Sequence, residues 1–268
     1  MNLSELSPAR RAYLKQQKRR KRAILFCQIG VLVGFFALWE LAAQLGWIDS
    51  FILSQPSRIA TTYLSMLQDG LLLHIGVTVY ETLVGFVLGV VLGLIVAVAL
   101  WWSPFLSKVS EPYLVVLNSL PKIALGPVII VVAGAGTGAI IFMALAISLV
   151  VTILEMLSGF HRTDAEYIRM ARTFGATRSQ IFRKIVFPYN LPTLFNSLKV
   201  NIGLSLVGVI AGEFLVSKAG LGYLIVYGGQ VFKLDLVMAS VLILAVVAAL
   251  MYEAVALLQW LVLRHQNR

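Results

Sequence analysis

A chain of 268 residues that is 59% hydrophobic and only 13% charged is too apolar for an ordinary soluble domain and belongs to the membrane class. Its formal net charge of +10 could suggest nucleic-acid binding, but the positions of the basic residues give a topological explanation instead. The one cysteine, Cys27, lies in an apolar run, so an internal disulfide is excluded and a buried core thiol is expected.

Six apolar stretches each approach or exceed the roughly 20 residues that a helix needs to cross a bilayer. They cover residues 23–47, 75–101, 113–133, 139–160, 194–216 and 237–263. The first is longer than a secretion-signal core of about 7–15 residues, so we expect it in the mature protein. Such long runs exclude barrel strands. The predicted fold class is an all-α integral membrane protein with about six transmembrane helices, divided into a basic tail (1–22) and a transmembrane domain (23–268).

The distribution of Lys and Arg predicts the orientation. If the spans alternate in direction, 17 of these basic residues fall on one side of the membrane: eight in the tail, six within 162–184, and Lys108, Arg264 and Arg268. The other side receives three, namely Arg58, Lys218 and Lys233. Cytoplasmic loops carry this excess, so both termini are expected inside. On the outer side, segments 49–74 and 218–234 are predicted to form short interfacial or re-entrant helices.

Small residues recur every fourth position in two spans. The second span contains Gly85, Gly89 and Gly93, and the fifth contains Gly208 and Gly212. This spacing lets helix backbones approach closely. The close contact is either within the chain or with a partner subunit, and the sequence leaves both open.

The third span is predicted to kink or break at Pro121, which removes an amide donor and clashes with the preceding turn. Asn118, Ser119 and Lys122 flank this break and are candidates for a polar pathway, unless the kink has no ligand role. Glu213, in the fifth span, is the strongest candidate for a structural or pathway carboxylate. The alternatives for Glu213 are pairing with a lysine or contact with water.

Motifs of catalysis and metal binding are missing from the sequence. It contains no G-x-x-x-x-G-K-[ST], no H-E-x-x-H and no G-x-S-x-G. Its three histidines stand far apart at span ends, so no metal site is expected. We therefore predict no catalytic residues and no cofactor bound by this chain.

Residues 163–188 form a polar, basic island that is predicted to fold as a helix–turn–helix. Two capping boxes are expected, Thr163 with Glu166 and Thr177 with Gln180. Gly175 supplies a left-handed stop between the helices, and Pro188 is expected to end the second helix. One apolar face is predicted for the first helix, formed by Tyr167, Ile168, Ala171 and Phe174. Docking to a protein and resting on anionic lipid both fit this pattern.

The same island resembles the cytoplasmic loop shared by permease subunits of bacterial ATP-binding cassette (ABC) importers, written E-A-A, three residues, Gly, then an apolar-Pro end. The matching residues are Ala171, Gly175-Ala176, Phe182, Ile185 and Phe187-Pro188. Only the second alanine of E-A-A is kept, since the chain has Arg169-Met170-Ala171. Segments 51–58, 120–127, 211–213 and 220–224 resemble the nitrate/sulfonate/taurine branch, which includes permeases for thiamine-precursor pyrimidines. Unlike many relatives, the chain has Glu81 where they carry a basic residue.

This resemblance implies a type I ABC importer permease-like fold in the bacterial cytoplasmic membrane. It implies a pathway for a small solute, a pair of cytoplasmic ATPase subunits that use ATP and Mg, a second permease copy in a homodimer, an external solute-binding protein, surrounding lipid and no nucleic acid. The coupling loop would be 161–191, with the ATPase contacted through Ala171, Phe174, Gly175, Ala176, Phe182, Ile185 and Pro188. A channel or secondary carrier without an ATPase is the alternative.

Overall fold

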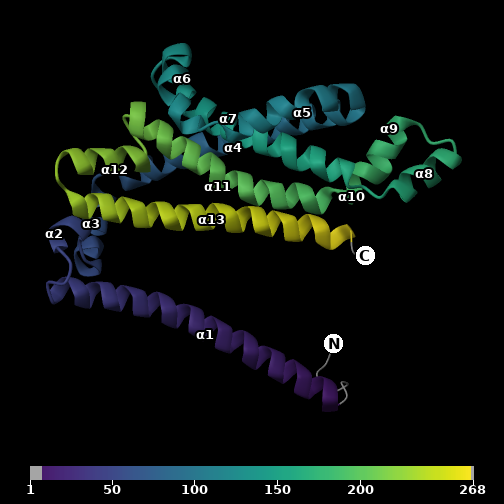
Figure 1. The fold of residues 1–268 in the computed structure, drawn as a ribbon. Coiled ribbons are helices and arrows are strands. Elements are labelled where there is room, and N and C mark those ends of the chain that lie inside the picture. The colour runs from purple at the N-terminus through teal and green to yellow at the C-terminus, as the bar shows by residue number, and fades with distance from the viewer. Residues whose placement is uncertain (1–7, 267–268) are drawn as a thin grey trace.

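The computed structural model describes residues 8–266, and within that range every regular element is a helix (Figure 1). Five helices of this described part are long and apolar enough to span a membrane. They are α1 (Pro8–Gln44), α4 (Leu71–Trp102), α7 (Thr137–His161), α11 (Leu191–Val216) and α13 (Leu234–Gln266). Residues 1–7 of the predicted tail, and Arg268, lie outside the described residues. The rest of the tail is helical and continuous with the first span, without a break at residue 22.

The third predicted span is broken, as its prolines indicated. It consists of α5 (Pro104–Ser119), a 3-10 turn η2 (Lys122–Leu125) and α6 (Gly126–Ala133), which together bend by 84°. Leu120 has an extended backbone, as expected for a residue before proline, and Pro121 then redirects the chain. The helical part also begins at Pro104, earlier than the predicted start at 113. Residues 8–266 thus contain five candidate spans, or six if this bent pair crosses the membrane once.

Short helices gather at the two ends of the long ones. At one end lie α2 (Ser50–Leu53), α3 (Pro56–Gln68) and α12 (Leu221–Gln230), where the sequence predicted interfacial helices (Figure 1). At the other end lie α8 (Ala165–Thr173), α9 (Arg178–Ile181), the π-turn η3 (Phe182–Val186) and α10 (Phe187–Tyr189). Figure 1 shows the ends labelled N and C on the same side as α8–α10.

The core forms where α7 packs between α4 and α11, which are the two most extensive helix contacts. Glycine makes this packing possible. A Cβ on Gly85 would lie 2.5 Å from the Cβ of Ala144, and a Cβ on Gly208 would lie 2.8 Å from the Ala144 Cα. Gly93 meets Thr152 of α7 in the same way. These repeated glycines therefore serve contacts within the chain, which decides between the two possibilities that the sequence left open.

Helix α1 stands apart from the other spans along most of its length (Figure 1). It packs on α3 near its C-terminal end, where the Glu40 carboxylate accepts hydrogen bonds from the backbone N–H (3.0 Å) and the hydroxyl (2.9 Å) of Ser57. Cys27 is exposed on this helix. The expectation of a core thiol is wrong, because the span that carries Cys27 packs little of its surface against the chain.

A pair of substitutions on α11 tests the glycine contact. Gly208→Ala is expected to destabilise the protein by about 1–3 kcal/mol, because the added methyl meets backbone atoms of Ala144 that cannot rotate away. Gly203→Ala is the control, since nothing lies within 4 Å of its Cβ position. The control is expected to be neutral or slightly stabilising. The measurement is the thermal unfolding midpoint of each variant in detergent, and equal midpoints would refute the internal role.

Candidate functional site

Residues 163–190 form what we call the interspan hairpin, because it connects α7 to α11. Its turn is a Schellman motif at the end of α8. The Ala176 N–H donates to the Ala171 carbonyl (3.0 Å), and the Gly175 N–H donates to the Arg172 carbonyl (2.9 Å). Gly175 has φ +78°, a left-handed conformation that suits glycine. The predicted stop at Gly175 is confirmed.

One of the two predicted capping boxes is present. The Thr177 N–H donates to Gln180 Oε1 (2.8 Å), and the Gln180 N–H donates to Thr177 Oγ1 (3.3 Å). This reciprocal pair starts α9 and follows directly from the local sequence.

The first predicted capping box is wrong, because Asp164 rather than Thr163 caps α8. The Glu166 N–H donates to Asp164 Oδ1 at 2.8 Å. Thr163 is buried, and its hydroxyl accepts a hydrogen bond from Asn190 Nδ2 at 2.8 Å. This contact closes the base of the interspan hairpin, since Asn190 directly precedes α11.

Pro188 does not end the second helix, contrary to the sequence expectation. The helical run from Arg178 continues through η3 and α10 to Tyr189. In the π-turn the Phe187 N–H donates to the Phe182 carbonyl, five residues earlier. The wider turn explains how a proline is accommodated, because an α-helical turn would bring its ring against a carbonyl four residues back.

Aromatic packing fixes the interspan hairpin to the ends of α4 and α7. The Phe182 ring lies 5.0 Å from the Trp101 ring and 5.4 Å from the Phe160 ring, measured between centroids. Ile168 and Ala176 pack against the same cluster. Phe182, which the family resemblance assigned to an ATPase contact, is thus half-buried within its own chain.

Arg178 adds a polar contact that sequence reasoning missed. Its guanidinium lies 5.2 Å from the Trp101 ring and 5.9 Å from the Trp102 ring, and its Nη2 donates to the Trp101 carbonyl at 3.0 Å. The paired tryptophans at the end of α4, a position typical of the membrane–water interface, were the available signal.

The apolar face predicted for α8 is divided in two. Ile168 and Ala171 point into the cluster, whereas Tyr167, Met170 and Phe174 are exposed to 49%, 54% and 84%. Their i, i+3, i+7 spacing places them on one side of the helix. Met170 was overlooked in the sequence. Of the other predicted contact residues, Gly175 is exposed, while Ala176, Ile185 and Pro188 are half-buried.

The predicted pathway residues do not converge. Ser119 Oγ donates to the Val115 carbonyl (2.9 Å) and Lys122 Nζ donates to the Asn118 carbonyl (3.1 Å), so both serve the end of α5. Glu213 is buried on α11. No hydrogen bond or ion pair joins it to these three among residues 8–266.

Glu213 instead holds the start of α12. Its carboxylate accepts from Thr78 Oγ1 (2.6 Å) and from the Gly222 N–H (2.5 Å). The preceding amides are held in the same way, with the Leu221 N–H donating to Thr78 Oγ1 (2.8 Å) and the Gly220 N–H to His74 Nδ1 (3.0 Å). Three consecutive helix-start amides are thus satisfied by side chains of α4 and α11. Glu213 therefore has a structural role.

A polar groove that the sequence did not reveal runs between α7 and α11 beside the interspan hairpin. Its volume is about 640 Å³. Polar and charged side chains line it, namely Glu155, Ser158, Arg162, Tyr189, Asn190, Thr193, Asn196 and Ser197. One oxygen of Glu155, Oε2, is buried without a hydrogen-bond partner among the described residues. The polar residues at the start of α11 could have indicated a groove. They do so only once it is known that α7 lies opposite them, and the sequence does not give that neighbour.

A family model described as the binding-protein-dependent transport system inner membrane component matches residues 89–266. A probable ABC transporter permease protein of Haemophilus influenzae is 28% identical over 239 residues, covering 88% of this chain and 94% of the relative. The putative aliphatic sulfonates transport permease protein SsuC of Bacillus subtilis is 26% identical, covering 86% of this chain and 84% of the relative.

Among solved structures, the inward facing MetNI methionine ABC transporter aligns with a TM-score of 0.64 at 22% identity, covering 70% of this chain and 94% of the matched chain. The fold is thus that of a type I importer permease. Because the family model spans more than half of the sequence, this chain belongs to the binding-protein-dependent transport system inner membrane component family and is a multi-pass permease subunit of an ABC importer.

Proposed function

We propose that the interspan hairpin docks into a separate cytoplasmic ATPase and transmits its motion to the transmembrane helices. The exposed apolar face of Tyr167, Met170 and Phe174 carries this proposal, because it lies beyond the end of α7 (Figure 1). Large exposed apolar side chains at a loop tip are typical of a protein contact. In this proposal the partner ATPase binds and uses ATP and Mg, and the permease chain contributes no cofactor.

The orientation follows from the basic residues. The interspan hairpin and both described chain ends lie at the end that carries the excess of Lys and Arg, which is the cytoplasmic side. The opposite end, with α2, α3 and α12, then faces the external solute-binding protein. Family membership supports both partners.

The polar groove is proposed to form the cytoplasmic half of the solute pathway. Ser158 and Asn196 are exposed on a membrane-spanning helix pair, with the half-buried Glu155 beside them, and contact of these polar side chains with lipid would be costly. A second copy of the chain packed against this face would shield the groove from lipid and form its missing wall, so that the groove stays filled with water. We therefore propose a homodimer that carries a small polar solute of the sulfonate, nitrate, taurine or thiamine-precursor kind.

Removal of the most exposed ring tests the docking surface. Phe174→Ala is expected to weaken the complex with the ATPase about 30-fold, because a central apolar contact residue contributes about 2 kcal/mol or more. The control is Phe51→Ala, an exposed phenylalanine at the opposite end. The measurement is copurification of the ATPase with each permease variant, followed by titration. Equal retention by both variants would refute the docking role of Phe174, whereas absence of any ATPase from the preparation of the unmodified permease would support a carrier that needs no ATPase.

Cysteine labelling tests the groove. In a Cys27→Ser background, Ser158→Cys is expected to react with a membrane-impermeant thiol reagent applied to inside-out vesicles, because the groove holds water. Val131→Cys, an exposed position on the apolar α6, is the control and is expected to stay unlabelled. Failure of Ser158→Cys to react, with normal assembly, would exclude the groove as a pathway.

A further inference from the structure

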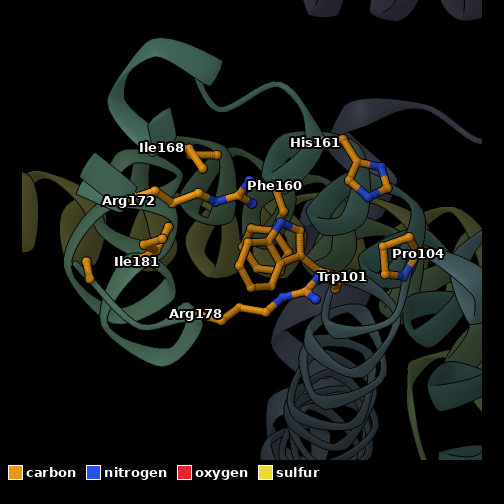
Figure 2. Close-up of a pocket in the computed structure, with 9 residues that line it drawn as sticks. Trp101, Pro104, Phe160, His161, Ile168, Arg172, Arg178 and Ile181 are labelled. Atoms are coloured by element: carbon orange, nitrogen blue, oxygen red, sulfur yellow. Dashed lines mark hydrogen bonds between the residues drawn. The ribbon is translucent and has the colours of Figure 1, made fainter. Parts of the chain in front are cut away.

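A second cavity lies at the base of the interspan hairpin, separate from the polar groove. Its volume is about 480 Å³, and it opens between the hairpin and the ends of α4, α5 and α7. Its lining is Trp101, Pro104, Phe160, His161, Ile168, Arg172, Ala176, Arg178 and Ile181. Figure 2 shows Arg172 and Arg178 both directed toward the Trp101 and Phe160 rings, with His161 on the opposite wall.

The polar side chains of this cavity favour an anion. Two arginines and a histidine line it, and the lining contains no carboxylate. Arg178 uses one nitrogen for the Trp101 carbonyl, while the guanidinium of Arg172 forms no hydrogen bond or ion pair with any residue that the structure describes. Both guanidinium groups therefore keep donors for a ligand. A planar guanidinium matches the geometry of phosphate oxygens.

The remaining walls favour an amphiphile over a small inorganic ion. Trp101 and Phe160 present rings, and Ile168 and Ile181 add aliphatic surface. The neighbouring Trp101 and Trp102 end α4, a position typical of the membrane–water interface. Basic pockets between helices on the cytoplasmic side suit anionic lipid headgroups.

We infer that this cavity binds the phosphate of an anionic phospholipid from the cytoplasmic leaflet, with Arg172 and Arg178 on the phosphate and the glycerol region against Trp101 and Phe160. The inference rests on the proposed orientation and not on docking of the ATPase. Arg172 and Arg178 belong to the interspan hairpin, whereas the two rings belong to α4 and α7. A bound lipid would therefore hold the hairpin against the ends of the spans.

Native mass spectrometry of the purified full-length permease measures this binding directly, whether or not an ATPase copurifies. The probes are phosphatidylglycerol and phosphatidylcholine with identical acyl chains. Phosphatidylglycerol is expected to bind preferentially, and Arg172→Gln is expected to weaken it about tenfold through loss of a charge-assisted contact. Arg172→Lys is expected to retain part of the binding because it keeps the charge.

The matched control is Arg169→Gln on the same helix. Arg169 lies outside the cavity lining, and its Nε donates to the Ala165 carbonyl at 3.3 Å. Equal weakening by Arg169→Gln and Arg172→Gln would show diffuse attraction to a basic surface and overturn the site. Equal binding of phosphatidylcholine would overturn it as well. Displacement of the lipid by millimolar inorganic phosphate would replace the lipid assignment with a free-phosphate site.

Discussion

The close backbone contact of α7 with α4 and α11 is the constraint on which the rest of the structure depends. Lipid tails are as apolar as leucine, so helices in a bilayer gain little from burying apolar side chains and associate through tight packing. Gly85 and Gly208 bring both neighbours against the Ala144 region of α7. This contact determines which sides of α7 and α11 remain outward, and therefore where the polar groove lies.

Features that depend on local physics were predictable from the sequence. Spans follow from hydropathy over about 20 residues. The Gly175 turn and the Thr177 capping box follow from contacts within a few residues, and the break at Pro121 follows from proline geometry. The predictions failed where a distant residue decides the outcome. Thr163 is not a cap because Asn190, which is 27 positions later, takes its hydroxyl.

Side-chain roles were harder to predict than helices, because a periodic pattern gives a face but not the partner of that face. The apolar residues of α8 divide between an inner cluster and an exposed surface, and only the position of the Phe160 and Phe182 rings decides which residue belongs to which. Glu213 shows the same limit. Its partners Thr78 and Gly222 come from another span and from the start of α12, so sequence spacing gave no indication of a helix-start contact.

The hydrogen bond between Thr163 and Asn190 turns the interspan hairpin into a closed ring, because it joins the residues at the two feet of the hairpin. No glycine interrupts the helical run from Arg178 to Tyr189. In the proposed coupling role, a force applied at the tip near Phe174 is therefore transmitted to α7 and α11 together, because the two feet of the hairpin are joined. In the proposed homodimer, the change in access then arises between the two permease copies, and the lining of the groove within each copy stays the same.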